Sequence, residues 1–329
     1  MQTFKFLLKR AVQLILLSLL VTFAAFWLSS IIPGDFFSTR LLDSSIRIET
    51  VNQLRHKYGL DQPVTVQYLH WLKNLLQLDL GQSLFYQRPV AQVVAEALAK
   101  TLWMGIPALI VGFGAGIVLG TVRGILSRRS LARIWDFFSA VALSLPSLLL
   151  GLALLLFAAY TNWFPLGGMN TLGDPATGFW NWLIDRTHHL ILPVLCLSFP
   201  VIAYVERVQY AATLSNLGAV YIRAARSRGL GYFRIFFQYI LRPGLNPVLS
   251  ISGPMLAGIL SGSLILEVIF DWPGLGQITY DALFSSDIFL LTGCILGSSV
   301  LLVTGNLLAD IALVILDPRT RLLNRKGLR

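Results

Sequence analysis

Charged residues are scarce in this chain. Only 13% of its 329 residues are Asp, Glu, Lys or Arg, whereas 55% are hydrophobic. A soluble chain carries about 25% charged residues, and too few ionic side chains are present to cover a hydrated surface of this size. The scarcity excludes a water-soluble, disordered or collagen-like chain and indicates an integral membrane protein.

Cysteine and metal-ligand patterns are also nearly absent. The two cysteines, Cys196 and Cys294, both lie inside apolar runs, so we expect them to pack as small apolar side chains and not to form a disulfide framework. No His-Glu-x-x-His zinc pattern is present. His188 and His189 are adjacent, so their side chains diverge on a helix. We expect neither a metal site nor a catalytic centre.

A nucleotide-binding loop is missing as well. A P-loop requires Gly-Lys-Ser or Gly-Lys-Thr, because backbone amides and the lysine together hold the phosphates. None of the six lysines follows a glycine. The chain therefore lacks the P-loop of an ATPase, and any ATP-driven work requires another polypeptide.

What the sequence does contain is long apolar runs. Six of them are long enough to cross the roughly 30 Å hydrocarbon core, which takes about 20 helical residues. They cover approximately residues 11–32, 102–122, 134–160, 190–212, 245–270 and 288–316. We predict an all-α polytopic membrane protein with six transmembrane helices and both termini on one side. The first run resembles a signal peptide but lacks a small-x-small cleavage site, so we interpret it as a retained anchor.

Basic residues are distributed unevenly between the two sides of the predicted membrane domain. When loops are assigned alternately, 18 of the 26 Lys and Arg residues fall on one face. Since basic loops remain cytoplasmic during insertion, we expect both termini in the cytoplasm. For a membrane chain this explains the net charge of +10 better than nucleic-acid binding does.

The chain is expected to divide into four parts. These are residues 1–32, the cytoplasmic N-terminus and first span; 33–101, an external loop region; 102–316, a five-helix core with a cytoplasmic loop at 216–243; and 317–329, a basic cytoplasmic tail.

The external region is long enough to have structure of its own. Thr50 with Gln53 predicts the capped start of a short helix, and Gly59 predicts its end. Pro63 is suited to open a second helix, rich in aromatic and aliphatic residues. We expect this second helix to lie against the membrane or against neighbouring spans.

The loop between the fourth and fifth spans predicts two short helices joined at a glycine bend. Ala224 and Ala225 have small side chains, so another protein can approach the backbone of the first helix closely. Gly229 allows the positive φ that ends a helix sharply. We expect Pro243 to break the second helix where the fifth span begins. Anything that holds such a loop pulls on both spans that it joins.

This loop resembles the EAA-type cytoplasmic loop of ABC importer permeases, in the variant of the dipeptide, oligopeptide and nickel group. In that variant Ala-Arg-x-x-Gly-Leu, residues 225–230 of this sequence, replaces Glu-Ala-Ala. Further motifs match that group in the expected order, which makes the resemblance specific over nearly the whole chain. They are Leu-Asp-Gln-Pro at 60–63 with Asp-Leu-Gly-Gln-Ser at 79–83, the stretch 267–276, and Asp-Pro-Arg at 317–319.

The resemblance implies a type I ABC importer permease-like fold with an external loop domain between the first two helices. It implies a bacterial inner-membrane subunit that forms half of the translocation path for peptides or a related small solute. The implied partners are a second, paralogous permease subunit, two cytoplasmic ATPase subunits and an external solute-binding protein. ATP and Mg²⁺ are then used by the ATPase subunits, and no cofactor is bound by this chain.

The resemblance also assigns site residues. The ATPase-coupling element it implies consists of Tyr221, Arg223, Ala224, Ala225, Arg226, Arg228, Gly229 and Leu230. The external gate it implies consists of Trp272, Pro273, Gly274, Leu275 and Gly276. Independently of the resemblance, helix-weakening residues make the fifth span a candidate pore liner and hinge, at Pro254, Gly258 and Gly262. The Gly258-x-x-x-Gly262 spacing also fits plain helix packing.

Two alternatives remain open from the residues alone. Charges within or beside spans, at Glu206, Glu267 and Asp310, are compatible with a secondary transporter driven by an ion gradient. A membrane-embedded enzyme is the second alternative. Glu206, Glu267 and Asp310 can also be explained without any transport role, as members of local ion pairs. In that case Glu206 requires Arg207 or a group on another helix or subunit as its partner.

Overall fold

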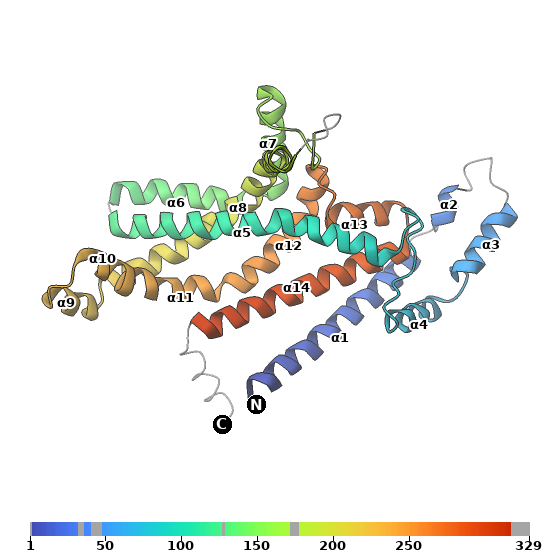
Figure 1. The fold of residues 1–329 in the computed structure, drawn as a ribbon, viewed down its shortest axis with the longest axis horizontal. Coiled ribbons are helices and arrows are strands. Elements are labelled where there is room, and N and C mark those ends of the chain that lie inside the picture. The colour runs from blue at the N-terminus through green and yellow to red at the C-terminus, as the bar shows by residue number, and fades with distance from the viewer. Residues whose placement is uncertain (1, 32–35, 41–47, 127–128, 172–177, 317–329) are drawn as a thin grey trace. The chain divides into compact units, whose positions relative to one another are not determined.

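The computed structural model describes residues 2–31, 36–40, 48–126, 129–171 and 178–316 of the chain. For some residues inside helices only the backbone is described. Figure 1 shows that the described chain is built of helices. Within these ranges no β-strand forms, and an isolated antiparallel bridge joins Gln82 to Pro89. The all-α prediction is confirmed.

The helices follow one another along the chain, separated by short connections. They are α1 (Gln2–Ile31), α2 (Phe36–Arg40), α3 (Ile48–Tyr58), α4 (Val64–Leu75), α5 (Val90–Leu126), α6 (Arg129–Ser144), α7 (Ser147–Thr161), α8 (Phe179–Leu217), α9 (Val220–Ser227), α10 (Tyr232–Ile235), the π-helix η1 (Phe236–Leu241), α11 (Arg242–Ser250), α12 (Ser252–Ile269), α13 (Leu275–Phe284) and α14 (Ile288–Leu316).

The chain forms two compact units. Unit 1 contains Met1–Thr101 and Pro273–Val303, and unit 2 contains Leu102–Trp272 and Thr304–Arg329. The long helices α5 and α14 each contribute to both units.

Several described helices are suited to a membrane. Val90–Leu126, Phe179–Leu217 and Ile288–Leu308 are each long and apolar enough to cross one, and Arg133–Ser144 with Ser147–Thr161 adds a fourth crossing if the pair is one span. The apolar part of α1, Ile15–Leu28, is shorter. A polytopic membrane protein is thus supported, whereas the number six stays a prediction.

The third predicted span is not one straight helix. Its two halves, α6 and α7, are bent by 99° relative to each other. Pro146, with φ −59° and ψ 135°, lies between them in an extended conformation. Proline has no N–H to donate and disfavours a helical conformation at the preceding residue. The apolar run over 134–160, predicted as one span, is therefore broken at Pro146.

The fifth predicted span consists of two helices, α11 and α12. They meet at Ile251, whose φ of −90° and ψ of −5° depart from the regular helical values. Pro254 lies in the first turn of α12. Proline is tolerated there, because an N–H in the first turn has no carbonyl of the same helix to bond with. The fifth predicted span is thus interrupted at Ile251, between Pro247 of α11 and Pro254 of α12.

In unit 1, α4 packs against α1. The Tyr68 hydroxyl donates a hydrogen bond to the carbonyl of Leu19 at 2.8 Å. The Phe26 ring lies 5.5 Å from that of Tyr68 and 5.8 Å from that of Trp71, centroid to centroid. The prediction that this helix lies against a neighbouring helix is confirmed. Thr50 lies inside α3, so the predicted capped start at Thr50 is wrong, while the predicted end at Gly59 (φ +68°) is confirmed.

In unit 2, a stripe of glycines on α5 packs against α8. Gly112, Gly116, Gly120 and Gly124 recur every fourth residue and therefore share one face of the helix. A Cβ added at these positions would approach Val201, Val205, Gln209 and Thr213, respectively, to within 2.6–2.8 Å. The facing residues on α8 also recur every fourth position, so the helices approach closely along four turns.

Candidate functional site

The loop between α8 and α11 forms a compact elbow around the short helix α9, shown at one end of unit 2 in Figure 1. Ile222 and Ala225 are three residues apart and share the buried face of α9. They pack against Ile235 and Ile240 from the following segment. This small apolar cluster fixes the orientation of α9 relative to the start of α11.

The opposite face of α9 is exposed. Of the eight residues predicted for docking, Tyr221, Arg223, Ala224, Arg226, Arg228 and Gly229 are exposed, Leu230 is half-buried, and Ala225 is buried. The face open to another molecule is thus basic at its edges and has the small side chain of Ala224 between them. Ala225 instead supports the elbow from inside.

Gly229 ends α9 in a Schellman arrangement. Its φ is +71°, its N–H donates to the carbonyl of Arg226 at 3.0 Å, and the N–H of Leu230 donates to the carbonyl of Ala225 at 3.3 Å. Ala225 and Leu230 also belong to the same apolar cluster, which is the contact that usually accompanies this motif. The predicted glycine bend is therefore present.

The second helix of the elbow differs from its prediction. After α10, η1 continues directly into α11, and the N–H of Arg242 donates to the carbonyl of Phe237, five residues back. Such a widened turn tolerates a proline that would clash with a regular α-helical turn. The predicted break at Pro243 is wrong, because this residue lies in the first turn of α11 and the helix passes through it.

Asn216, which was not predicted as a site residue, ties the elbow together. Its side-chain oxygen accepts a hydrogen bond from the Tyr221 hydroxyl at 2.8 Å, and its amide nitrogen donates to the carbonyl of Ile240 at 3.2 Å. Partial burial raises the pKa of the Tyr221 hydroxyl. Gly244 packs beside this amide, because an added Cβ would lie 3.4 Å from the Asn216 nitrogen and 3.1 Å from Gln209 Nε2. The Asn216 side chain thereby joins the end of α8 to both α9 and η1.

A buried ionic cluster joins the C-terminal parts of α5 and α8 to α6. Arg123 Nη1 donates to Glu206 Oε1 at 2.9 Å, and Arg123 Nη2 donates to Asp136 Oδ1 at 2.5 Å. Ser139 Oγ donates to the other Glu206 oxygen at 3.1 Å, and the Arg123 guanidinium lies 4.0 Å from the centre of the Tyr210 ring. The partner of Glu206 is on another helix, as one of the predicted explanations required. This carboxylate is committed to a structural pair and gives no support to an ion-coupled transport mechanism.

The Asp-Leu-Gly-Gln-Ser motif at 79–83 has a structural role in unit 1. Ser83 Oγ donates to Asp287 Oδ2 at 2.8 Å, and the same oxygen accepts the N–H of Phe85 at 3.0 Å. The other Asp287 oxygen accepts the N–H of Leu290 at 3.1 Å, at the first turn of α14. One buried carboxylate therefore fastens this segment to the beginning of α14.

Comparison with known families decides the identity. Residues 112–322 match the binding-protein-dependent transport system inner membrane component family, and residues 3–104 match the N-terminal region of a binding-protein-dependent transport system membrane component. The chain belongs to the binding-protein-dependent transport system inner membrane component family. It is a permease subunit of an ABC importer, and its ATPase is a separate subunit.

Relatives of this permease match over nearly their whole length. The oligopeptide transport system permease protein AppB of Bacillus subtilis (strain 168) is 34% identical over 319 residues, covering 95% of this chain and 98% of the relative. The dipeptide transport system permease protein DppB of Lactococcus lactis subsp. cremoris (strain MG1363) is 31% identical over 321 residues, covering 97% and 99%.

A solved structure supports the fold of the permease. A chain of the MetNI methionine ABC transporter in an inward facing conformation matches with a TM-score of 0.52 and 17% identity, covering 69% of this permease and 96% of that chain. At this level of identity the similarity concerns the fold alone. The family resemblance expected from the sequence motifs is confirmed.

The predicted gate turn of the permease is packed inside protein. Trp272 and Leu275 are buried, and the N–H of Trp272 donates to the carbonyl of Glu267 at 2.8 Å. Beyond the turn, the N–H of Leu275 donates to Thr101 Oγ1 at 2.8 Å. Gly274 and Gly276 are also buried, and Pro273 is half-buried. The boundary between the two units falls between Trp272 and Pro273, inside this turn.

The structure does not describe the side chains of some residues that were predicted to line the pore or form a hinge. Pro254 and Gly262 belong to α12, but the structure describes only their backbone. Gly258 is exposed, and no neighbouring atom lies within 4 Å of a Cβ added there. The Asp310 side chain and the Asp-Pro-Arg motif at 317–319 also lie outside the described residues.

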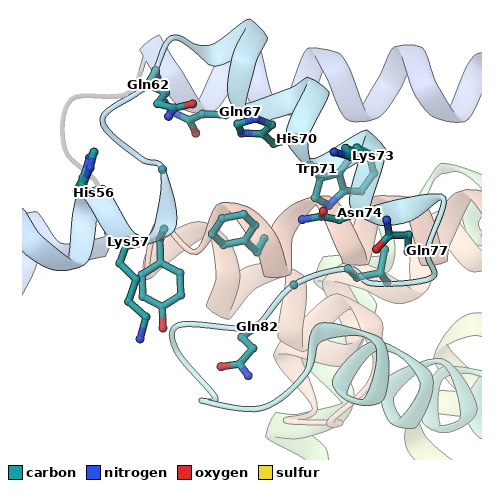
Figure 2. A pocket seen from close by; sticks show the side chains of 15 residues that line it. His56, Lys57, Gln62, Gln67, His70, Trp71, Lys73, Asn74, Gln77 and Gln82 are labelled. Carbon is teal, nitrogen blue, oxygen red and sulfur yellow. Dashed lines mark hydrogen bonds between the residues drawn. The ribbon is translucent and has the colours of Figure 1, made fainter.

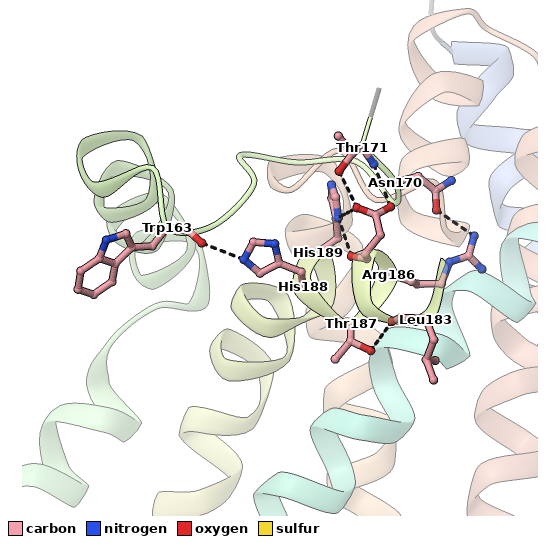
Figure 3. Close-up of polar contacts among 9 residues, drawn as sticks. Trp163, Asn170, Thr171, Leu183, Arg186, Thr187, His188 and His189 are labelled. Atoms are coloured by element: carbon pink, nitrogen blue, oxygen red, sulfur yellow. Dashed lines mark hydrogen bonds and ion pairs between the residues drawn. The ribbon is translucent and has the colours of Figure 1, made fainter. Parts of the chain in front are cut away.

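The two adjacent histidines of the permease point in different directions, as predicted (Figure 3). His188 Nε2 lies 2.8 Å from the carbonyl of Trp163, whereas His189 Nδ1 lies 2.9 Å from the carbonyl of Asp185 and 3.5 Å from its carboxylate. Asp185 also accepts hydrogen bonds from the backbone and hydroxyl of Thr171. In the described part of the chain no group of three or more potential metal ligands gathers. These residues fasten the 163–171 loop to α8.

Proposed function

We propose that this permease subunit forms half of the translocation path for peptides in the bacterial inner membrane. The substrate class rests on the relatives, whose names specify oligopeptide and dipeptide transport. The ABC importer family implies ATPase and solute-binding partners. We propose that a second, paralogous permease completes the path, that two ATPase subunits use ATP and Mg²⁺, and that both termini are cytoplasmic.

The elbow around α9 is the proposed contact with one ATPase subunit. The observation that carries this proposal is the two-sided character of α9, which is locked to the permease by Ile222 and Ala225 and open on its other face. A small residue flanked by arginines suits a groove that has acidic edges. Because Asn216 and Ile240 connect the elbow to both α8 and η1, a displacement of α9 is passed to two helices of unit 2.

The turn at 272–276 and α12 are the proposed moving parts of the path. The turn joins the two compact units, and α12 follows an interruption of the helical span at Ile251. Such breaks allow helix segments to reorient as a whole. We propose that the turn acts as the external gate, and that Pro254, Gly258 and Gly262 mark the hinge and pore-lining part of α12.

Substitution of Gly229 tests the coupling proposal. No neighbour lies within 4 Å of an added Cβ, so the positive φ is the strain that a side chain meets at this position. Valine strongly disfavours this conformation, whereas asparagine tolerates it. In vesicles that contain the complete transporter, we expect G229V to insert normally but to lose ATP-dependent peptide uptake, and G229N to keep most of it. Normal uptake by G229V would contradict the proposal.

Labelling of Ser227 replaced by cysteine tests the orientation separately. Ser227 is exposed, and both native cysteines are buried, so background labelling is low. We expect an impermeant maleimide to label S227C in inverted vesicles and not in intact cells. Labelling in intact cells would place the elbow outside and reverse the proposed topology.

A further inference from the structure

Unit 1 contains a cavity that no part of the proposed transport mechanism uses. Its volume is about 700 Å³, within the range of pockets that hold small ligands. It lies between the end of α3, one face of α4, the segment 80–82 and the Phe289 side chain of α14. Figure 2 shows His56 and Lys57 on one side of this space and Asn74 and Gln77 on the other.

The wall of the cavity is polar because α4 presents two different faces. Tyr68, Leu72 and Leu75 belong to the apolar cluster that packs against α1. Another face of α4 lines the cavity with residues at helical spacing, whose side chains are amides or basic groups. They are Gln67, His70, Lys73 and Asn74, and Gln77 follows beyond the end of the helix. The opposite side adds Gln62 and Gln82. Polar side chains therefore face one another across a cavity that is partly open to solvent.

The charge of the wall has one sign. Among the fifteen lining residues are two lysines and two histidines, and no aspartate or glutamate. Neither Lys57 nor Lys73 makes an ion pair in the part of the chain that the structure describes. The nearby carboxylate of Asp61, which is outside the wall, accepts a hydrogen bond from His56 at 2.8 Å. That bond lowers the pKa of Asp61 and engages the carboxylate with the histidine.

Two buried polar atoms of the wall lack hydrogen-bond partners among the described residues. They are Gln62 Oε1, an acceptor, and Trp71 Nε1, a donor, and Trp71 is only 2% exposed. Buried groups without partners are costly, and a bound ligand is one way of satisfying them. A ligand for this wall carries a negative charge for the lysines, and hydrogen-bond donors and acceptors for the amides.

We propose that this cavity binds a carboxylate on an amide-bearing chain, such as the carboxyl end of a short peptide. The lysines neutralise the single charge, the five Gln and Asn side chains pair with backbone amides, and the rings of Tyr58, Trp71 and Phe289 contact side chains of the ligand. The wall contains no arginine, so it lacks the planar fork that recognises phosphate in two-point fashion. The lining includes no residue of α9 or of the turn at 272–276.

Binding can be measured on the full chain alone in lipid nanodiscs, using tryptophan indole ¹⁵N signals. The chain has eight tryptophans, and the variant W71F identifies the signal of Trp71. We expect tri-alanine to shift this signal, and tri-alanine amide, which lacks the carboxylate, to bind about tenfold more weakly. K57Q and K73Q should each weaken tri-alanine binding about tenfold, whereas K100Q, outside the cavity, should not change it. Unchanged signals from the other indoles show that each variant is folded.

The results separate the possible sources of the carboxylate. If acetyl-Ala-Glu-Ala-amide binds and tri-alanine does not, the site takes an acidic side chain, as a protein partner would present it. Binding of tri-alanine assigns it to the end of a peptide. Equal shifts by tri-alanine and its amide, no shift by any of the three probes, or undiminished binding by the K57Q/K73Q double variant would overturn the proposal. The measurement needs no ATPase subunit, so its failure would leave the coupling proposal intact.

Discussion

Arg123 and Glu206 form a buried ion pair between α5 and α8, with 2.9 Å between Nη1 and Oε1. The exposed fractions of the two side chains are 5% and 2%. Ser139 and Asp136 of α6 complete the cluster, which therefore joins three helices of unit 2. The cluster lies on α8 before the elbow begins. It is therefore suited to hold α8 in a fixed position against α5 and α6.

Loss of Glu206 should destabilise the protein much more than loss of Asp136. E206L leaves the buried Arg123 charge without its buried partner, which costs about 3–5 kcal/mol of unfolding free energy. D136L removes a carboxylate that is 62% exposed and should cost less than about 1 kcal/mol. The checking measurement is thermal unfolding of the purified variants in detergent.

The double variant R123L/E206L is the control for this prediction. It removes both buried charges, so most of the stability lost in E206L should return. If E206L unfolds at the same temperature as the parent protein, the pair has no structural role.

The glycine stripe on α5 predicts a sharp contrast between two alanine substitutions. A Cβ at Gly120 would lie 2.5 Å from the carbonyl oxygen of Glu206 and 2.9 Å from the backbone nitrogen of Tyr210, so α5 and α8 must separate. G120A should cost about 1–3 kcal/mol of stability. A Cβ at Gly114 has no neighbour within 4 Å, so G114A should be neutral or slightly stabilising. Equal unfolding temperatures for the two variants would mean that α5 and α8 do not pack through this stripe.

Tyr86 predicts a loss of stability at alkaline pH. Its hydroxyl donates to Asp281 Oδ2 at 2.6 Å, and burial together with this carboxylate raises the pKa of Tyr86 well above its usual value. In the unfolded chain the pKa is near 10, so above about pH 10 the unfolded state loses a proton that the folded state keeps. The stabilisation is thus complete below about pH 10 and declines as the pH rises further.

The variant Y86F isolates this effect, because it keeps the ring and lacks the titrating hydroxyl. From about pH 9 to about pH 11, which brackets the pKa of an unfolded tyrosine, the unfolding temperature of the parent should fall more steeply than that of Y86F. Parallel curves would show that Tyr86 does not titrate differently in the folded and unfolded states.

Local features of the chain were predictable from its sequence, because each depends on neighbouring residues. The bend at Gly229 follows from the conformational freedom of glycine, and the ending of α3 at Gly59 follows for the same reason. A proline such as Pro146 can break a helix, but the 99° angle of the bend between α6 and α7 cannot be read from its presence alone. Pro243 was misread because the widened turn of η1 accommodates it.

Features that join distant parts of the chain were not predictable from one sequence. A partner on another helix was one of the alternatives for Glu206, yet Arg123 is 83 positions away, and nothing in the spacing selects it. The four-residue glycine spacing of α5 was readable, but it does not reveal that α8 carries the facing residues. The connecting role of Asn216 and the cavity beside α4 likewise arise only when separate segments meet.

The most direct test of the central claim is cross-linking from α9 to the ATPase subunit. Ala224 is exposed and Ala225, the next residue, is buried, so A224C and A225C form a matched pair on the same helix. Membranes that contain the complete transporter are treated with a short thiol-to-amine cross-linker, and the adducts are identified by mass spectrometry. The account predicts an adduct between A224C and a P-loop-containing subunit, and little or none from A225C. Efficient reaction of A224C without any ATPase adduct would contradict it.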